Sequence, residues 1–349
     1  MLSFSDTTLD KIIVHHIGNP SHDEPLNCSK EEFPLTDPDL EGILGKFFLS
    51  PFQKKALSFY NFKHDSDLEL NEMYHYASKM FNPGESFALQ SVNMAKHLYD
   101  KSGHPMVKSG ELYIVLLNNI MVEDELTDGI GIFKSENKDT FLKVYAGGNS
   151  CSIEYQDGIN INKLDKGCLI FNTEKEHGYK ICILDKTNAE ESRFWKDHFL
   201  KVAPRDDDFY HTKTVMHMAK SFCNTMLVEE NDVPRSKQLE VKEKVVQYFS
   251  EKEEFSLDSF EQEVLEEPQV IDSYRSFRQQ FAEQQDLLTK DSFAIAEPAV
   301  KKEKKNFKSV IKLDKNFHIY VHGNPNMLEK GFDDGRGKFY YKLFFDAEE

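Results

Sequence analysis

The sequence predicts an α+β protein with a mainly antiparallel sheet, flanking helices, a following helical region and a C-terminal strand pair. Three observations support this fold class. Short apolar runs separated by turn residues fill positions 111–185, apolar residues at helical spacing lie before and after them, and strand-like runs return near the C-terminus. The connections between the central runs are mostly too short for crossover helices, which favours antiparallel pairing.

The N-terminal part predicts one strand followed by two helices. Leu9–Gly18 is apolar and β-branched and ends in a Gly-Asn-Pro turn, as a strand would. Apolar residues then recur at helical spacing in two segments, 39–60 and 85–98.

The central part predicts the sheet itself. Its apolar runs are Leu112–Leu117, Ile130–Phe133, Phe141–Tyr145, Cys168–Phe171 and Tyr179–Leu184. Because the third and fifth runs alternate imperfectly, we expect one face of the sheet to be packed and the other to be wetter.

The chain becomes helical again after position 188 and then returns to strands. Val215, Met218 and Phe222 begin a stripe at helical spacing, and similar stripes follow at 241–249, 257–264 and 271–281. Strand-like runs follow at 310–313, 317–322 and 338–345. We therefore expect an α+β domain at 1–205, an acidic helical region at 206–297, and a basic segment with C-terminal strands at 298–349. Whether those strands rejoin the first domain is left open.

Composition excludes several classes of protein. The 349 residues include 43 Lys and Arg against 60 Asp and Glu, a net charge of −17 that argues against a surface binding nucleic acid everywhere. No apolar stretch approaches the roughly 20 residues that span a bilayer, and the N-terminus lacks a basic and then apolar leader. The five cysteines form no C-x-x-C pair, which is typical of reduced thiols in a cytosol.

A lysine run is the main local departure from this acidic background. Between positions 301 and 315 there are seven lysines and two acids, whereas 229–291 holds 17 acids and eight bases. Such lysines can neutralise phosphates without reading bases, so the run predicts a local DNA-binding surface. Its proposed residues are Lys301, Lys302, Lys304, Lys305, Lys308, Lys312 and Lys315. Two alternatives stay open: a merely solvated run, or contact with the acidic helices of this chain or of a partner.

No pattern supports catalysis or metal binding. The segment Gly42–Phe47 lacks the spacing and the hydroxyl residue of a phosphate-binding loop. His211 and His217 follow three aspartates, but those carboxylates fit the N-terminus of a helix better than a metal site. The E-x-K at Glu240–Lys242 falls in a helical pattern, whereas a nuclease would carry it on a strand. We therefore expect no catalytic residue, no metal and no cofactor.

The order of several segments resembles a known family. LDKIIVHHIGN at 9–19, DGIGIFKSENKDTFLKVY at 128–145 and FKSVIKLDKNFHIYVHG at 307–323 are similar to the NdpA type of bacterial nucleoid-associated proteins, in particular to its Bacteroidetes-like branch. The similarity runs over essentially the whole chain and includes ELYIVLLNN, FWKDHFL and KFYYKLFF.

This resemblance implies a non-enzymatic protein of the bacterial cytoplasm and nucleoid, with a role in chromosome organisation and association with double-stranded DNA. Together with the lysine run, it predicts weak DNA binding without strong sequence preference. The alternative function is a protein–protein adaptor, recruited to the nucleoid by a DNA-handling enzyme such as a topoisomerase, without direct DNA contact. Topoisomerase or another nucleoid protein is thus a candidate partner, a membrane is not, and the oligomeric state is not predicted.

Overall fold

The computed structural model describes residues 2–53, 58–123, 125–147, 150–185, 194–228, 231, 233–285, 287–307, 309–313, 317–321, 327–345 and 347. The chain divides into two compact units, Met1–Arg205 and Asp206–Glu349. Each unit is described by itself below.

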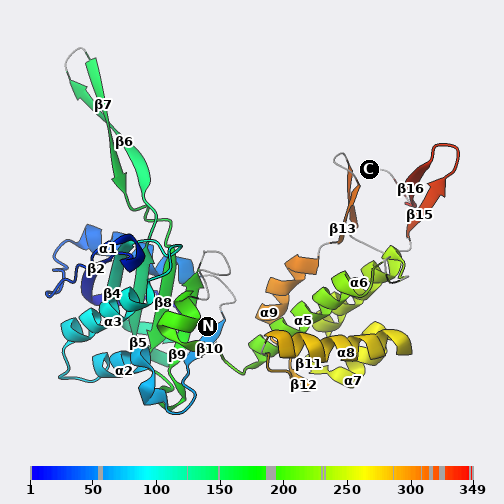
Figure 1. The fold of residues 1–349 in the computed structure, drawn as a ribbon, viewed down its shortest axis with the longest axis horizontal. Helices are drawn as coiled ribbons and strands as arrows, with labels where there is room; N and C mark the ends of the chain where they lie inside the picture. Colours follow the sequence, from blue (N-terminus) through cyan, green and yellow to red (C-terminus); the bar gives the residue numbers. More distant parts are fainter. Residues whose placement is uncertain are drawn as a thin grey trace. The chain divides into compact units, whose positions relative to one another are not determined.

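An eight-stranded antiparallel sheet forms the middle of the first unit (Figure 1). Its order is β1-β4-β5-β8-β9-β3-β10, and β2 also pairs with β4. The strands are β1 Leu2–Ser3, β2 Thr8–Ile17, β3 Phe59–Phe62, β4 Gly110–Val122, β5 Glu125–Ser135, β8 Lys166–Phe171, β9 Lys180–Asp185 and β10 Val202–Pro204. The predicted α+β class with a mainly antiparallel sheet is confirmed.

Helices cover both faces of this sheet. Along β4, Leu112 and Ile114 pack into one apolar cluster and Tyr113 and Val115 into another. Helices α2 (Glu72–Met80) and α3 (Phe87–Lys101) and the π-helical turn Phe194–Leu200 contribute to the first cluster, and α1 (Pro38–Leu49) contributes to the second. The expectation of one wetter face is wrong, because the apolar runs supply side chains to two buried faces at once.

A glycine in β5 allows tight packing on the α1 side. A side chain at Gly131 would collide with the ring of Phe133, which stacks on Phe48 of α1 with 4.5 Å between ring centroids. Gly131 therefore serves packing between sheet and helix.

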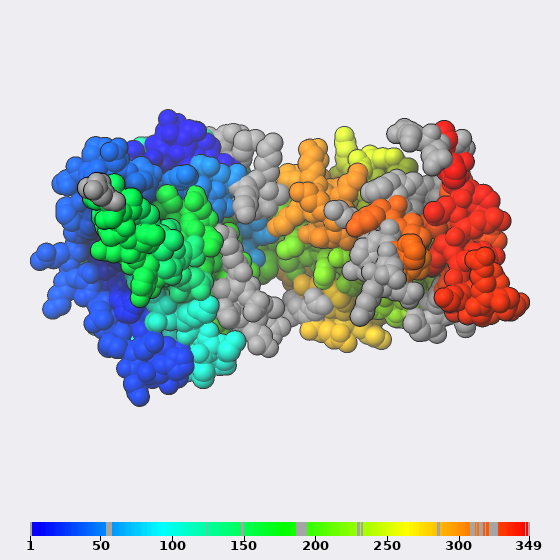
Figure 2. All heavy atoms as spheres, turned by 90° about the horizontal axis from the view of Figure 1, so that it is seen from above, coloured from blue at the N-terminus to red at the C-terminus, as the bar shows by residue number. Residues whose placement is uncertain are grey.

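Strands β6 (Asp139–Gly147) and β7 (Ser150–Gly158) leave the sheet as a separate two-stranded hairpin. We call residues 139–158 the arm. In Figure 1 it extends well beyond the sheet, and in Figure 2 its green spheres point toward the viewer. The run Phe141–Tyr145 is a strand as predicted, but it pairs only with β7 and is not part of the main sheet.

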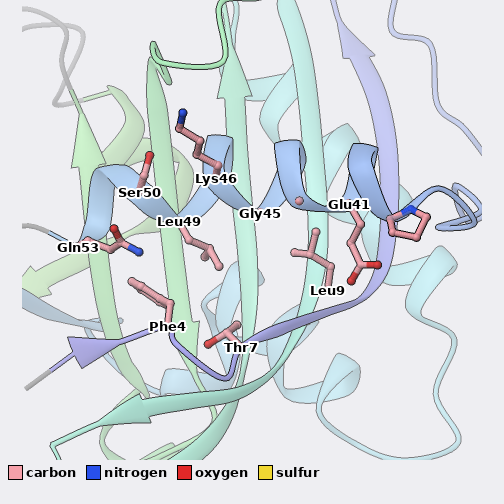
Figure 3. A pocket seen from close by; sticks show the side chains of 11 residues that line it. Phe4, Thr7, Leu9, Glu41, Gly45, Lys46, Leu49, Ser50 and Gln53 are labelled. Carbon is pink, nitrogen blue, oxygen red and sulfur yellow. The ribbon is translucent and has the colours of Figure 1, made fainter.

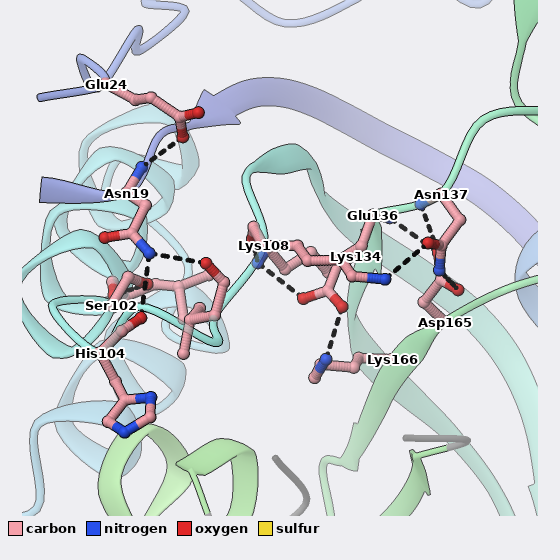
Figure 4. A network of polar contacts seen from close by, with 12 residues as sticks. Asn19, Glu24, Ser102, His104, Lys108, Lys134, Glu136, Asn137, Asp165 and Lys166 are labelled. Carbon is pink, nitrogen blue, oxygen red and sulfur yellow. Dashed lines mark hydrogen bonds and ion pairs between the residues drawn. The ribbon is translucent and has the colours of Figure 1, made fainter. Parts of the chain in front are cut away.

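A buried ionic network fixes the root of the arm (Figure 4). Lys134 of β5 and Lys166 of β8 are opposite each other in the sheet and almost fully buried. Both bind Glu136, with Nζ–Oε distances of 2.8 Å from Lys134 and 2.6 Å from Lys166. Burial lowers the pKa of Lys134, and the adjacent Glu136 carboxylate opposes that shift.

Asp165 holds the next two residues of the chain. Its carboxylate accepts backbone N–H bonds from Glu136 and Asn137 at 2.7 and 3.1 Å, and the Asn137 side-chain amide donates to it at 2.7 Å. The path from β5 into the arm is therefore specified by hydrogen bonds.

The second unit is a helical core with small strand pairs. Its helices are α5 Asp208–Thr225, α6 Arg235–Glu251, α7 Leu257–Phe260, α8 Pro268–Gln285 and α9 Glu297–Glu303, with a π-helical turn at Glu261–Leu265. A short pair, β11 (Glu254–Ser256) with β12 (Ser292–Ala294), joins their core. The predicted stripes match α5 to α8, and this confirms the expected helical region.

Two C-terminal hairpins complete the second unit. β13 (Ser309–Leu313) pairs with β14 (Phe317–Val321), and β15 (Leu328–Asp333) pairs with β16 (Lys338–Leu343). The β15–β16 hairpin, red in Figure 2, has mostly exposed side chains. Among the described residues, each of these strands pairs only within its own hairpin.

Within the described ranges, no helix has both the length and the apolar composition that crossing a bilayer requires.

The buried network gives a first prediction. Replacing Glu136 by Gln leaves two buried ammonium groups without their shared carboxylate, so we expect a loss of about 3–5 kcal/mol in the free energy of unfolding, measured by urea denaturation. The control is Glu154→Gln on the exposed arm, which should change stability by less than about 0.5 kcal/mol. Equal stability of the Glu136 variant and the wild type would contradict the role assigned to this carboxylate.

A second prediction concerns pH. His15 is buried between sheet and α3, where its Nε2 lies 2.5 Å from Ser91 Oγ, and burial lowers its pKa to about 4. Between the ordinary pKa of 6.5 and about 4, the unfolded chain binds a proton that the folded protein does not, so stability falls as pH is lowered through this window.

Urea denaturation at pH 7 and pH 5 tests this. His15 should account for about 2 kcal/mol of the loss at pH 5, and His15→Gln should remove that part. The exposed His22, changed to Gln, is the matched control and should leave the pH dependence as it is in the wild type. An unchanged pH dependence in His15→Gln would contradict the buried neutral histidine.

Candidate nucleic-acid interface

The first half of the lysine run lies on helix α9 and on the 3₁₀ turn Lys304–Phe307. Ala299, Val300, Glu303 and Phe307 are buried, at spacings that place them on one side of this continuous helical segment. Lys301, Lys302, Lys304 and Lys305 are all exposed. Helical geometry therefore turns these four lysines outward, and we call them the α9 lysine surface.

The four lysines differ in their neighbours. Lys301 Nζ lies 2.5 Å from Glu297 Oε1 one turn earlier, and this contact lowers the pKa of the Glu297 carboxyl. Lys302 Nζ lies 5.9 Å from the centre of the Phe209 ring. In the part of the chain that the structure describes, no carboxylate forms an ion pair with Lys304 or Lys305. The cationic character of the surface is therefore greatest at Lys304 and Lys305.

The other three predicted lysines are not placed. Lys308 and Lys315 lie outside the described residues, and so does the side chain of Lys312 in β13. The structure thus brings together four of the seven lysines.

Most basic side chains of the acidic helices form ion pairs with carboxylates of the same region. Of the eight basic residues at positions 229–291, six contact carboxylates: Lys237, Lys244, Lys252, Arg275, Arg278 and Lys290. The pair of Arg275 with the buried Glu261 is bidentate, at 2.8 and 2.6 Å. Since acids outnumber bases by 17 to eight in 229–291, this pairing leaves a surplus of carboxylates. They do not neutralise Lys304 or Lys305 within the described ranges.

Comparison with known protein families places the chain in one of them. The family described as "Nucleoid-associated protein YejK" matches residues 13–342, nearly the whole chain. The chain belongs to this nucleoid-associated family. The resemblance found in the sequence is thereby confirmed at the level of the family, and its Bacteroidetes-like branch stays a prediction. No curated protein matches the chain.

Membership in the YejK family supports a nucleoid-associated role and a nucleoid location. The family description names a nucleoid-associated protein, not an enzyme. It does not specify DNA contacts or partners.

The histidines and aspartates considered for metal binding make contacts that cap and pack helix α5. Asp207 caps α5 by accepting the Tyr210 N–H at 2.8 Å, as expected for an acidic loop before a helix. Asp206 binds both His211 and Lys290, while the ring of His217 faces Phe281. Across the described ranges, no group of three or more His, Cys, Asp or Glu residues is arranged to hold a metal ion.

The E-x-K residues of this YejK-family chain are also structural. Both lie on α6, where Glu240 binds Lys244 at 2.7 Å and Lys242 is buried. The Lys244 ammonium lowers the pKa of Glu240. The helical position of Glu240 and Lys242 differs from the strand position that a metal-dependent nuclease would use.

An open pocket lies beside α1, between the helix and the segment before β2 (Figure 3). Gly42, Gly45 and Lys46 line it together with Glu41, Phe4 and Leu9. Gly42 and Gly45 lie inside α1, and the helix N-terminus is already capped by the Asp37 carboxylate. The backbone N–H groups that could hold a phosphate are therefore not available at these glycines.

Sequence reasoning missed a second cationic element. Hairpin β15–β16 carries Lys330, Arg336, Lys338 and Lys342 beside exposed aromatic rings. Lys330 Nζ lies 5.3 Å from the centre of the Phe339 ring, and Arg336 and Lys342 contact acids of the same hairpin. The interleaved lysines and aromatics of KFYYK were the available signal.

Proposed function

We propose that this nucleoid-associated protein binds double-stranded DNA weakly, and without strong sequence preference, through the α9 lysine surface. The observation that carries the proposal is that α9 and the 3₁₀ turn after it expose four lysines on the side opposite their buried residues. Family membership supports a nucleoid setting in which DNA is the abundant polyanion.

The chemistry of this surface favours phosphate contacts. A lysine ammonium is a compact point charge on a flexible stem, so it neutralises phosphate without the fork geometry that reads a base edge. The surplus negative charge of the chain repels DNA elsewhere. Binding that is local, weak and strongly salt-dependent follows from these two facts.

Lys304 and Lys305 provide the test. In Lys304→Glu/Lys305→Glu we expect weaker binding to a short fluorescent duplex, measured by anisotropy between about 50 and 200 mM salt. Each phosphate contact contributes a slope of about −0.9 to log affinity against log salt, so a variant losing two contacts should have a slope shallower by about 1.8.

The matched control is Lys96→Glu/Lys175→Glu, which changes the same net charge at two exposed lysines of the first unit. Equal loss of affinity in both double variants would show an effect of overall charge and contradict the assigned surface. Absence of binding by the wild type at the lowest salt would contradict direct DNA association.

The surplus carboxylates of the acidic helices favour a second function, that of an adaptor. Such a protein would contact a basic face of a DNA-handling enzyme, such as a topoisomerase, and reach the nucleoid without touching DNA. Electrostatic complementarity would speed this association and select the partner.

Nuclease-treated mixtures with purified topoisomerase separate the two functions. An adaptor should form a complex that survives Lys304→Glu/Lys305→Glu and weakens in Glu243→Lys/Asp272→Lys, which reverses charge at two exposed acids of α6 and α8. Size-exclusion chromatography measures the complex. No complex with the wild type after DNA removal would exclude this partner.

A further inference from the structure

The arm has an uncovered apolar face. In the β6–β7 register, Leu142 lies opposite Tyr155, Val144 opposite Ile153, and Ala146 opposite Cys151, so these pairs share one face of the hairpin. We call these six residues the arm stripe. Leu142, Val144, Ile153 and Tyr155 are 71%, 63%, 67% and 76% exposed. No described part of the chain covers them.

The opposite face of the arm is more polar. Lys143 lies opposite Glu154, and Tyr145 lies opposite Ser152. At the root of the stripe, Thr140 Oγ1 donates to Asp157 Oδ1 at 2.7 Å. This is the pattern of a strand pair that buries one face and solvates the other.

Hydrogen bonds at its root hold the arm in a defined position. Asp139 accepts from Asn160 Nδ2 at 2.7 Å and from Lys163 Nζ at 2.8 Å, and Asp165 holds the chain that enters β6. A two-stranded hairpin is marginal in water without further packing. A fixed root with a bare apolar stripe therefore points to an intermolecular contact.

We propose that the arm stripe packs face to face on the arm stripe of a second copy of this chain, forming a homodimer. The stripe itself carries no charge, and such a surface meets its own copy across a two-fold axis without like-charge contacts. The arm as a whole has one basic and three acidic residues, so it repels DNA and anionic membranes.

The length of the arm and the exposed area of the arm stripe are consistent with a second copy as the partner. Nine residues in each strand extend for about 30 Å, which is much longer than a Debye length of about 8 Å. The acidic remainders of the two chains are therefore screened from each other. The exposed side chains of the stripe offer about 600 Å² per copy, or about 1,200 Å² in total, which is the lower end of specific interfaces. The dimer should therefore dissociate measurably on dilution.

Sedimentation velocity from about 1 to 100 µM tests the proposal. The wild type should reach twice the chain mass of 40.5 kDa at high concentration. Ile153→Glu places a charge in the middle of the stripe and should give monomers throughout, whereas the matched control Ser152→Glu places it on the other face and should stay dimeric. A monomeric wild type, or equal behaviour of the two variants, would overturn the proposal.

A charge-swap mixture identifies the second copy as the occupant. Val144→Lys alone should also be monomeric, because its cross-strand neighbour is Ile153. Mixed with Ile153→Glu, it should restore a dimer in which the introduced lysine of one copy faces the introduced glutamate of the other. Circular dichroism should show equal folding of both variants, since both positions are exposed. A mixture of folded variants that stays monomeric would contradict face-to-face packing.

Discussion

Two ammonium groups inside the first unit depend on one carboxylate. Removing Lys134 and Lys166 from water carries a large desolvation cost, which close pairing of both with Glu136 offsets. The same short segment is where the chain turns out of the main sheet, with Asp165 binding its backbone. The charge network thus joins two adjacent strands and sets the direction of the arm. An apolar core at this point would pack equally well but would specify no such exit.

The positively charged residues of the second unit fall into two groups. The acidic helices satisfy most of their bases internally, as in the fork between Arg275 and Glu261. Lys304 and Lys305, in the turn after α9, form no ion pair with a described carboxylate, and Ala299, Val300 and Phe307 turn the opposite side of the helical segment into the core. A strongly acidic chain can in this way retain a local cationic surface.

Elements with a strong local period were predictable from sequence, and those fixed by distant contacts were not. The stripe through Val215 and Phe222 predicted α5 because a single helix face is buried. Strand β15 was missed because Glu329, Gly331 and Asp333 interrupt its pattern, and its pairing with β16 decides its conformation. The exit of β6 from the sheet has no local signal at all.

The same limit applies to the candidate site. Composition alone found the lysine run, but its arrangement depends on which residues of α9 are buried. In sequence, Lys134 and Lys166 look like ordinary surface charges, and only the strand register brings them to Glu136. The need for glycine at position 131 likewise depends on the ring of Phe133, which a side chain there would meet.

In the proposed DNA binding, the point-charge character of the α9 lysine surface has a kinetic consequence. A duplex presents nearly the same ladder of phosphates at every step, so a protein held by ammonium groups alone meets low barriers between neighbouring registers and can slide along the helix. Occupancy along a chromosome would then depend on the local ion concentration and on competing proteins, and not on sequence-specific binding sites.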